Sequence, residues 1–197
     1  FIIWMIDEAK KRGITKCFFL GDWHHNRASI NVSTLNYTTS NLRRLNDNFE
    51  QVIMITGNHD LYYREKREIH SLSMIEDFKN ITMINDKPLI EGDVAFIPWL
   101  CDDEWKSLRR IKCKYMFGYF ELPKFLMNAL VEMPDTGGLQ VEDLAGPDLV
   151  FSGHFHKRQK MKNVVYMGNT FPHNYADAWD DDRGCLLYTS PSPRDAE

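Results

Sequence analysis

Three glycine-led turns constrain the fold of this chain more than any other feature. Each follows a short apolar segment, and each carries side chains with oxygen or nitrogen donors. The turns are Gly21-Asp22-Trp23-His24-His25, Gly57-Asn58-His59-Asp60 and Gly153-His154-Phe155-His156, and they follow residues 16–20, 51–56 and 149–151. In α/β proteins, ligands collect at the carboxyl ends of buried strands. We therefore expect the three turns to meet at one site.

The first third of the chain alternates helices with strands. Apolar residues at helical spacing predict one helix over residues 1–12 and a second over 33–46, with Ser33 as its N-cap. Continuous apolar runs predict strands over 14–20 and 51–56. This alternation favours a mostly parallel α/β sheet.

The rest of the chain has a weaker pattern. We expect helices over residues 68–78, 105–112 and 126–131, and a long loop over 133–147. The expected strands are 81–84, 94–98, 114–117, 149–151 and 164–167. From residue 187 onward the composition changes and apolar periodicity is lost. The sequence thus predicts one domain over 1–186 and a disordered or non-native tail over 187–197.

The motifs Gly-Asp-x-x-His, Gly-Asn-His-Asp and Gly-His-x-His, in this order, resemble those of the calcineurin-like metallophosphoesterases. The context from Phe1 to about Cys185 resembles the nuclease subunit of SbcCD-type recombination complexes in its tailed-phage form. The resemblance implies an α/β fold, a four-layer α/β/β/α sandwich, here without its first strand. It also implies two divalent metal ions, Mn²⁺ by preference, DNA as substrate, and an SbcC-type ABC ATPase with a coiled coil as partner. Members of that family form homodimers.

The predicted metal ligands follow from positions in these motifs. Asp22 is the candidate for a carboxylate that bridges two ions, and Asn58 offers a neutral carbonyl oxygen. His154 and His156 could each give an imidazole to a different ion. Mixed oxygen and nitrogen ligands suit Mn²⁺, Fe or Zn²⁺ better than Ca²⁺.

The resemblance also implies roles for groups that do not bind metal. His59 would stabilise the transition state or protonate the leaving oxygen, and Asp60 would orient its imidazole. His25 would position the DNA end. The basic residues Arg27, Lys157 and Arg158 would contact the phosphate backbone, although basic side chains near a turn are often only solvated.

Two departures from the family pattern bear on activity. The family's first motif, Asp-x-His, would lie before Phe1, and Tyr119 stands where the family has a histidine ligand. A phenol with an ordinary pKa of ~10 is a poor ligand at neutral pH. We therefore expect the chain as given to bind metal weakly and to be inactive or nearly so.

Two other functions remain open from the sequence. One is a metallophosphoesterase acting on phosphoproteins or small phosphodiesters, and the other is a catalytically dead subunit that binds DNA or a partner. The formal charge of −4 argues only mildly against DNA, because bound metal ions supply positive charge at the phosphate. The spacing of the cysteines favours a reducing compartment such as the cytoplasm, and no apolar stretch predicts a membrane span.

Overall fold

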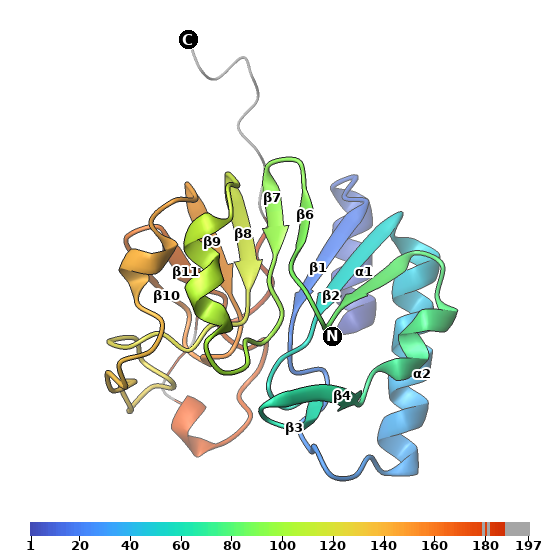
Figure 1. Cartoon of the computed structure of the whole chain (residues 1–197). Coiled ribbons are helices and arrows are strands. Elements are labelled where there is room, and N and C mark those ends of the chain that lie inside the picture. Colours follow the sequence, from blue (N-terminus) through green and yellow to red (C-terminus); the bar gives the residue numbers. More distant parts are fainter. Residues whose placement is uncertain (179, 181, 188–197) are drawn as a thin grey trace.

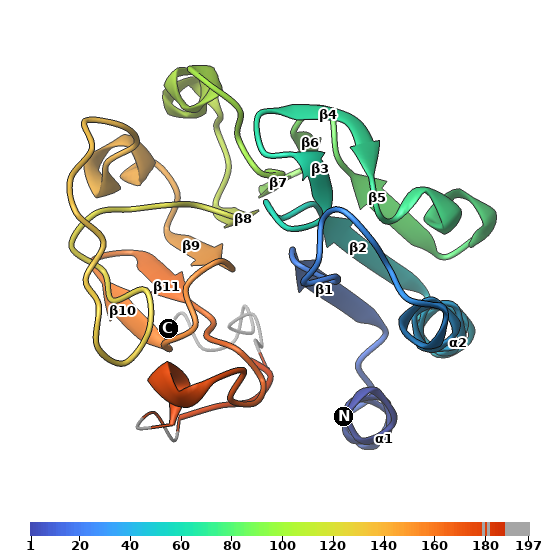
Figure 2. The same ribbon diagram turned by 90° about the horizontal axis from the view of Figure 1, so that it is seen from below.

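The computed structural model describes residues 1–178, 180 and 182–187 and is a mixed α/β protein. A three-stranded parallel sheet contains β1 (Lys16–Leu20), β2 (Gln51–Ile55) and β5 (Ile81–Ile84), in that order. Figures 1 and 2 show this sheet beside a second, six-stranded sheet. The strand order there is β10 (Gln159–Met161), β11 (Val164–Tyr166), β9 (Leu149–Ser152), β8 (Tyr115–Gly118), β7 (Val94–Phe96) and β6 (Leu89–Glu91). The predicted mostly parallel α/β arrangement is confirmed.

Two helices cover the outer face of the three-stranded sheet. Figure 2 shows α1 (Ile2–Lys11) and α2 (Val32–Asn48) on the side that faces away from the second sheet. Their apolar faces, including Ile6 and Leu42, pack with Val52 in one buried cluster. Both helices were predicted within two residues of their observed ends.

The sheets pack against each other through a second apolar cluster. Phe18 of β1 lies edge-on to both Phe96 and Phe117, with ring centroids 4.9 Å apart in each pair. Ile53 and Ile55 of β2 are buried in the same cluster. The outer face of the six-stranded sheet has its own core, which contains Met116, Val150 and Phe120. Each sheet is therefore buried on both faces.

The two sheets meet closely at the carboxyl ends of their central strands. The backbone N–H of Trp99, after β7, donates to the carbonyl oxygen of Thr56, after β2, at 2.8 Å. A methyl group on Gly153, after β9, would lie 2.0 Å from the carbonyl oxygen of Leu20 in β1. Only glycine permits this approach. Turns from both sheets are thereby brought to one place.

Several local predictions are wrong. Asn31, not Ser33, is the N-cap of α2, since its side chain accepts the Thr34 N–H at 2.8 Å. The residues expected to form a helix over 68–78 instead form the end of a β3–β4 hairpin (Leu61–Tyr63 and Lys66–His70) and a 3₁₀ helix, η1 (Ser73–Asp77). Hydrogen bonding with the preceding strand outweighs the helical spacing there.

The helix expected over 126–131 is a turn. The Asn128 side chain accepts the N–H groups of Leu130 and Val131, and the Met127 N–H donates to the Val131 carbonyl. This local bonding competes with a helix. Further 3₁₀ helices are η2 (Glu104–Arg110), where an α-helix was expected, η3 (Val141–Leu144), inside the expected long loop, and η4 (Tyr175–Asp177).

The predicted tail over 187–197 lies outside the described residues, apart from Leu187. Within the part of the chain that the structure describes, no helix combines the length and apolar character needed to cross a membrane.

Candidate active site

Asp22 lies at the tip of the turn after β1, pressed against the turn after β2. A methyl group on Gly57 would be 2.2 Å from Asp22 Oδ1, so the glycine is needed for this contact. The same oxygen accepts the backbone N–H of His59 at 2.9 Å. Asp22 has φ +58°, an unfavourable conformation for a residue with a side chain. The two turns thus hold the carboxylate in a strained, defined position.

Asp60 fastens these two turns together. Its buried carboxylate accepts backbone N–H groups from Gly57 at 2.9 Å, Asp22 at 2.8 Å and His24 at 3.2 Å. Burial and the nearby Asp22 charge raise the pKa of Asp60 to about 7, while the three N–H donors oppose this shift. The prediction that Asp60 orients His59 is wrong, because none of its contacts is with that imidazole and the backbone donors occupy its oxygens.

Asn58 has an unpaired oxygen in a buried position. Its residue is 5% exposed, and among the described residues nothing donates a hydrogen bond to Oδ1. Leaving such an atom without a partner costs roughly 1–3 kcal/mol. A cation at this point would satisfy it, as predicted for a carbonyl ligand.

Tyr119 fills the space between the sheets beside Asp22. Methyl groups on Gly21 and Gly153 would lie 2.4 Å and 2.8 Å from its Cδ2 atom, so both glycines make room for the ring. Its phenol is hydrogen-bonded to Asp22. Burial, together with the Asp22 charge and this hydrogen bond, raises the pKa of Tyr119 well above its ordinary value. The neutral phenol therefore donates to a predicted metal ligand.

His154, in the turn after β9, lies beside Tyr119. Its ring centroid is 5.0 Å from that of Tyr119, and Nε2 lies 3.4 Å from a carboxylate oxygen of Glu121. His154 has φ +82°, so the turns after β1 and β9 both carry a non-glycine residue in the left-handed region. Strain of this kind is concentrated at functional sites.

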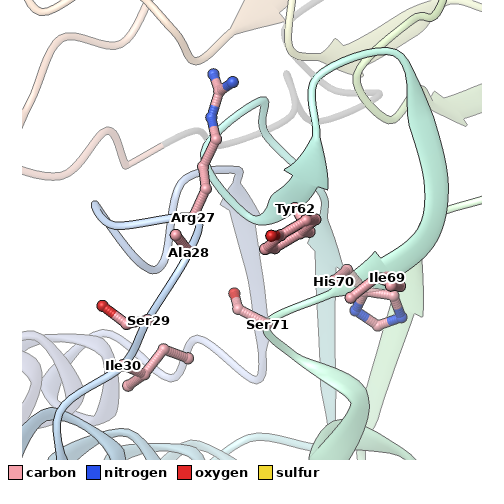
Figure 3. A pocket seen from close by; sticks show the side chains of 8 residues that line it. All are labelled: Arg27, Ala28, Ser29, Ile30, Tyr62, Ile69, His70 and Ser71. Carbon is pink, nitrogen blue, oxygen red and sulfur yellow. The ribbon is translucent and has the colours of Figure 1, made fainter.

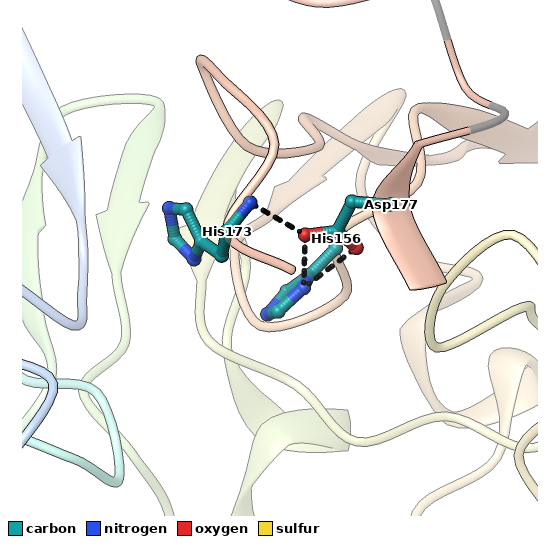
Figure 4. Close-up of side chains that lie close together, drawn as sticks. All are labelled: His156, His173 and Asp177. Carbon is teal, nitrogen blue, oxygen red and sulfur yellow. Dashed lines mark hydrogen bonds and ion pairs between the residues drawn. The ribbon is translucent and has the colours of Figure 1, made fainter. Parts of the chain in front are cut away.

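His156 belongs to a neighbouring cluster, drawn in Figure 4. Its Nδ1 lies 3.1 Å and 3.2 Å from the two carboxylate oxygens of Asp177. With His173, these residues form the one group of three or more His, Cys, Asp or Glu, among the described residues, whose ligand atoms all lie within 4.8 Å of one another. His156 therefore contacts the loop over residues 169–177, a contact that the motifs did not indicate.

His59 and His25 join the turns after β2 and β1. The His59 Nδ1 lies 2.7 Å from the His25 carbonyl oxygen, and the two rings stack with centroids 5.2 Å apart. In the neighbouring cluster, burial, then the charges of His156 and also of His25, lower the pKa of His173.

The three basic residues predicted to contact phosphate differ in their surroundings. The Arg158 guanidinium donates three hydrogen bonds within the protein, to the carbonyls of Met167 and Gly184 and to Asp182. Its role in binding substrate stays a prediction. Lys157 is half-buried.

Arg27 lines a cavity beside the turn after β1. The cavity has a volume of about 270 Å³, and Figure 3 shows residues 27–30 on one wall and Tyr62 with residues 69–71 on the other. In Figure 3 the Arg27 side chain extends away from the other labelled side chains, so its guanidinium lies at the edge of the cavity and not inside it.

Sequence reasoning missed two contributors to the site. Asp177 and His173 lie in a loop whose role the motifs did not reveal, and the spacing of four residues between them was the available signal. His24, in contrast, is buried as a packing residue, and its two ring nitrogens lie 2.7 Å and 2.8 Å from Ser71 and Thr38 hydroxyls.

The residues present fit a divalent cation at the Asp22–Asn58 pair. A carboxylate and an unpaired buried carbonyl oxygen are ligands that hard and borderline cations accept. The Tyr119 phenol limits this fit, because it occupies hydrogen-bonding capacity of Asp22. Asp22, His154 and His156 do not lie within 4.8 Å of one another, so they do not surround one ion.

No family model matches the chain. It is 26% identical over 197 residues to "Exonuclease subunit 1" of Enterobacteria phage T4, which covers 96% of this chain and 57% of that protein. It is 24% identical over 194 residues to "Putative phosphoesterase 244L" of Invertebrate iridescent virus 6, covering 89% of this chain and 64% of that protein. The chain spans less than two thirds of each of these relatives. These distant similarities support nuclease or phosphoesterase activity in general.

Proposed function

We propose that this chain is the metal-dependent phosphodiesterase part of a DNA nuclease. The proposal includes a calcineurin-like four-layer sandwich and membership of an SbcCD-like recombination or repair complex, with an SbcC-type ATPase as partner. The observation that carries it is the Asp22–Asn58 pair: the Asp22 carboxylate accepts the His59 N–H from the turn that also carries Asn58, whose buried side-chain oxygen has no hydrogen-bond donor among the described residues. The similarity to the phage exonuclease subunit supports DNA as the substrate.

In this proposal Asp22 and Asn58 hold a divalent cation, Mn²⁺ by preference. His154 and His156 each give an imidazole to a different ion. Bound ions would neutralise the phosphoryl oxygens and lower the pKa of attacking water. The backbone donors to Asp22 and Asp60 keep the oxygen ligands fixed before any ion arrives. Such preorganisation reduces the cost of binding.

His59 can act on the leaving group through its free ring nitrogen. Its Nδ1 must carry a proton to donate to the His25 carbonyl oxygen at 2.7 Å. A second proton can then only be at Nε2, from which the cationic imidazole can protonate a leaving alkoxide. The His25 backbone therefore performs the orienting role that was predicted for Asp60.

A second candidate function is a DNA- or partner-binding subunit that does not hydrolyse DNA. One observation favours it: the buried Tyr119 phenol is hydrogen-bonded to Asp22, the predicted bridging ligand. A carboxylate that accepts this bond has less capacity for two ions. Replacing the phenol therefore separates the two candidates.

The test measures Mn²⁺-dependent hydrolysis of duplex DNA, single-stranded DNA and an aryl phosphodiester. We expect slow hydrolysis by the wild-type chain, a rise of at least tenfold for Tyr119→His, and loss of that gain when Asn58→Ala is added. Asn41→Ala, on the exposed side of α2, is the matched control and should behave as wild type. Activity that survives Asn58→Ala would contradict the proposed centre.

The substrates separate the remaining functions. DNA hydrolysis well above that of the aryl phosphodiester supports a nuclease, and the reverse preference supports a phosphoesterase of small substrates. If Tyr119→His binds DNA but hydrolyses no phosphodiester, the binding subunit is the correct function.

A further inference from the structure

The loop over residues 169–177 is arranged around His156. The Asp177 carboxylate is 1% exposed and lies against Nδ1 of His156. It also accepts the amide N–H of Asn169 at 3.0 Å and the backbone N–H of His173 at 2.9 Å. These two donors fix the carboxylate independently of His156, so it can keep its position when the Nδ1 contact changes.

The His173 ring completes a set of two nitrogens and one oxygen. It meets the His156 ring edge-on, with centroids 5.2 Å apart, and Figure 4 shows the His156 ring beside the Asp177 carboxylate, with the His173 ring extending to the other side. One ligand atom from each residue lies within 4.8 Å of the others. Ligands at about 2.1 Å from a tetrahedral zinc ion are roughly 3.4 Å apart, so small side-chain rotations suffice to surround an ion.

We infer that His156, His173 and Asp177 form a binding site for one divalent transition-metal ion of the zinc class. This inference deepens the proposed function and rests on it for the use of the ion, because it names the residues that share an ion with His156. The site is separate from the Asp22–Asn58 pair. It uses Nδ1 of His156 and one carboxylate oxygen, which exchange their present hydrogen bond for bonds to the metal.

The chemistry of this set selects the ion. Two imidazoles and one carboxylate suit Zn²⁺ or Co²⁺ and leave one tetrahedral position open. A cavity of about 270 Å³ lies beside His173, lined also by Pro172, Asn174, Tyr175 and Ala178. Solvent or a phosphate oxygen can therefore reach the open position. The bond to the metal requires neutral imidazoles, so binding releases any proton that they carry.

Titration with Co²⁺ alone tests the inference, because tetrahedral Co²⁺ absorbs visible light strongly. We expect the wild-type chain to bind Co²⁺ with this spectrum and Zn²⁺ to displace it. His173→Ala and Asp177→Asn should each weaken Co²⁺ binding at least tenfold. Asp177→Asn retains an oxygen that accepts the Asn169 and His173 donors, and the exposed His173 can be replaced without disturbing the core. His70→Gln, a histidine outside the cluster, is the matched control.

The outcome also separates this site from a purely structural contact. If Asp177 only accepts the Nδ1 hydrogen of His156, His173→Ala will bind Co²⁺ as wild type does, and the inference is overturned. Absence of Co²⁺ binding overturns it as well. Asn58→Ala should abolish hydrolysis and leave the Co²⁺ spectrum intact, so the failure of the proposed function is distinguishable from failure of this site.

Discussion

At the residue scale, the Tyr119 phenol competes with the proposed metal ion for the Asp22 carboxylate. Tyr119 is held by close packing against Gly21 and Gly153, and its hydroxyl reaches the carboxylate from the opposite sheet. The motif could be read from the sequence, and so could the departure at Tyr119. The hydrogen bond could not be predicted, because it depends on how closely two sheets approach each other.

Replacing Tyr119 with phenylalanine keeps the ring and removes the hydroxyl. We expect Tyr119→Phe to lower the free energy of unfolding by about 1 kcal/mol through loss of one buried hydrogen bond. The same change frees a lone pair of Asp22, so Mn²⁺ should bind several-fold more tightly. Calorimetric titration with Mn²⁺ measures this, with Tyr37→Phe on the exposed side of α2 as control. Unchanged or weaker Mn²⁺ binding would count against a role for Asp22 as a ligand.

The hydrogen bond of the His59 ring also could not be predicted from the sequence. The family resemblance implied that Asp60 orients the His59 imidazole. In the structure, the tight turn directs the Asp60 carboxylate toward three backbone N–H groups, and the His25 carbonyl takes the His59 contact. Neighbours in a tight turn point in different directions.

At the element scale, the site depends on strand ends that approach within backbone contact. The strands predicted over 14–20, 51–56 and 149–151 correspond to β1, β2 and β9, because a continuous apolar run leaves a clear signal in the sequence. The hairpin β3–β4 and the short edge strands β6 and β10 were not predicted, since few of their residues are buried and no local pattern marks their pairing partners.

Gly153→Ala tests the approach of the two sheets. The added methyl group would meet the Leu20 carbonyl oxygen, and backbone cannot move aside as a flexible side chain can. We expect a loss of roughly 2–3 kcal/mol in the free energy of unfolding. Gly146→Ala, where a methyl group meets nothing within 4 Å, should change it by less than about 0.5 kcal/mol. Equal stability of the two variants in urea denaturation would refute the close approach.

A pH-dependent ion pair ties β4 to the segment after β7. Arg67 contacts the Glu104 carboxylate, which also accepts the Cys101 N–H at 2.9 Å. Burial acts to raise the pKa of Glu104, but these partners hold it below its ordinary value of 4.5. A depressed carboxyl pKa stabilises the fold above that ordinary value, and the contribution is lost as the pH falls through the folded-state pKa.

Glu104→Gln should therefore be less stable than wild type at pH 7, and the difference should shrink as the pH falls below 4.5. Thermal melting from pH 7 to pH 3 measures the difference, and exposed Glu132→Gln controls for the loss of one charge. The side chain of Glu104 is 43% exposed, so solvent screening keeps the effect small. A difference that stays constant over the whole pH range would contradict the ion pair's role.

At the scale of the whole molecule, the net charge of −4 gives no general attraction for nucleic acid. Several basic residues near the turns are also paired inside the protein, among them Arg64 with Glu121, Arg67 with Glu104 and Lys162 with Glu142. Charge patterns in the sequence could not reveal these pairs, because the carboxylates come from distant segments. Under the proposed function, binding of DNA would then depend on few local contacts and on bound metal ions.

Substitution of Arg27 and of Arg158 tests which basic side chains contact DNA. Arg27→Ala should weaken DNA binding severalfold and reduce its dependence on salt concentration, because Arg27 lines an open cavity. Arg158→Ala should mainly lower the melting temperature, since it removes hydrogen bonds to Met167, Asp182 and Gly184. Fluorescence anisotropy with labelled duplex DNA at several salt concentrations measures the first effect. If Arg158→Ala changes the salt dependence and Arg27→Ala does not, the assignment is reversed.

The central claim of the proposed function is that the turns after β1 and β2 bind a cation. The most direct measurement is the anomalous X-ray signal of Mn²⁺ in crystals of the chain grown with that ion. We predict a peak within bonding distance of both a carboxylate oxygen of Asp22 and Oδ1 of Asn58. Density that leaves the Asn58 oxygen without a cation, with Mn²⁺ bound only elsewhere or nowhere, would contradict the proposed centre.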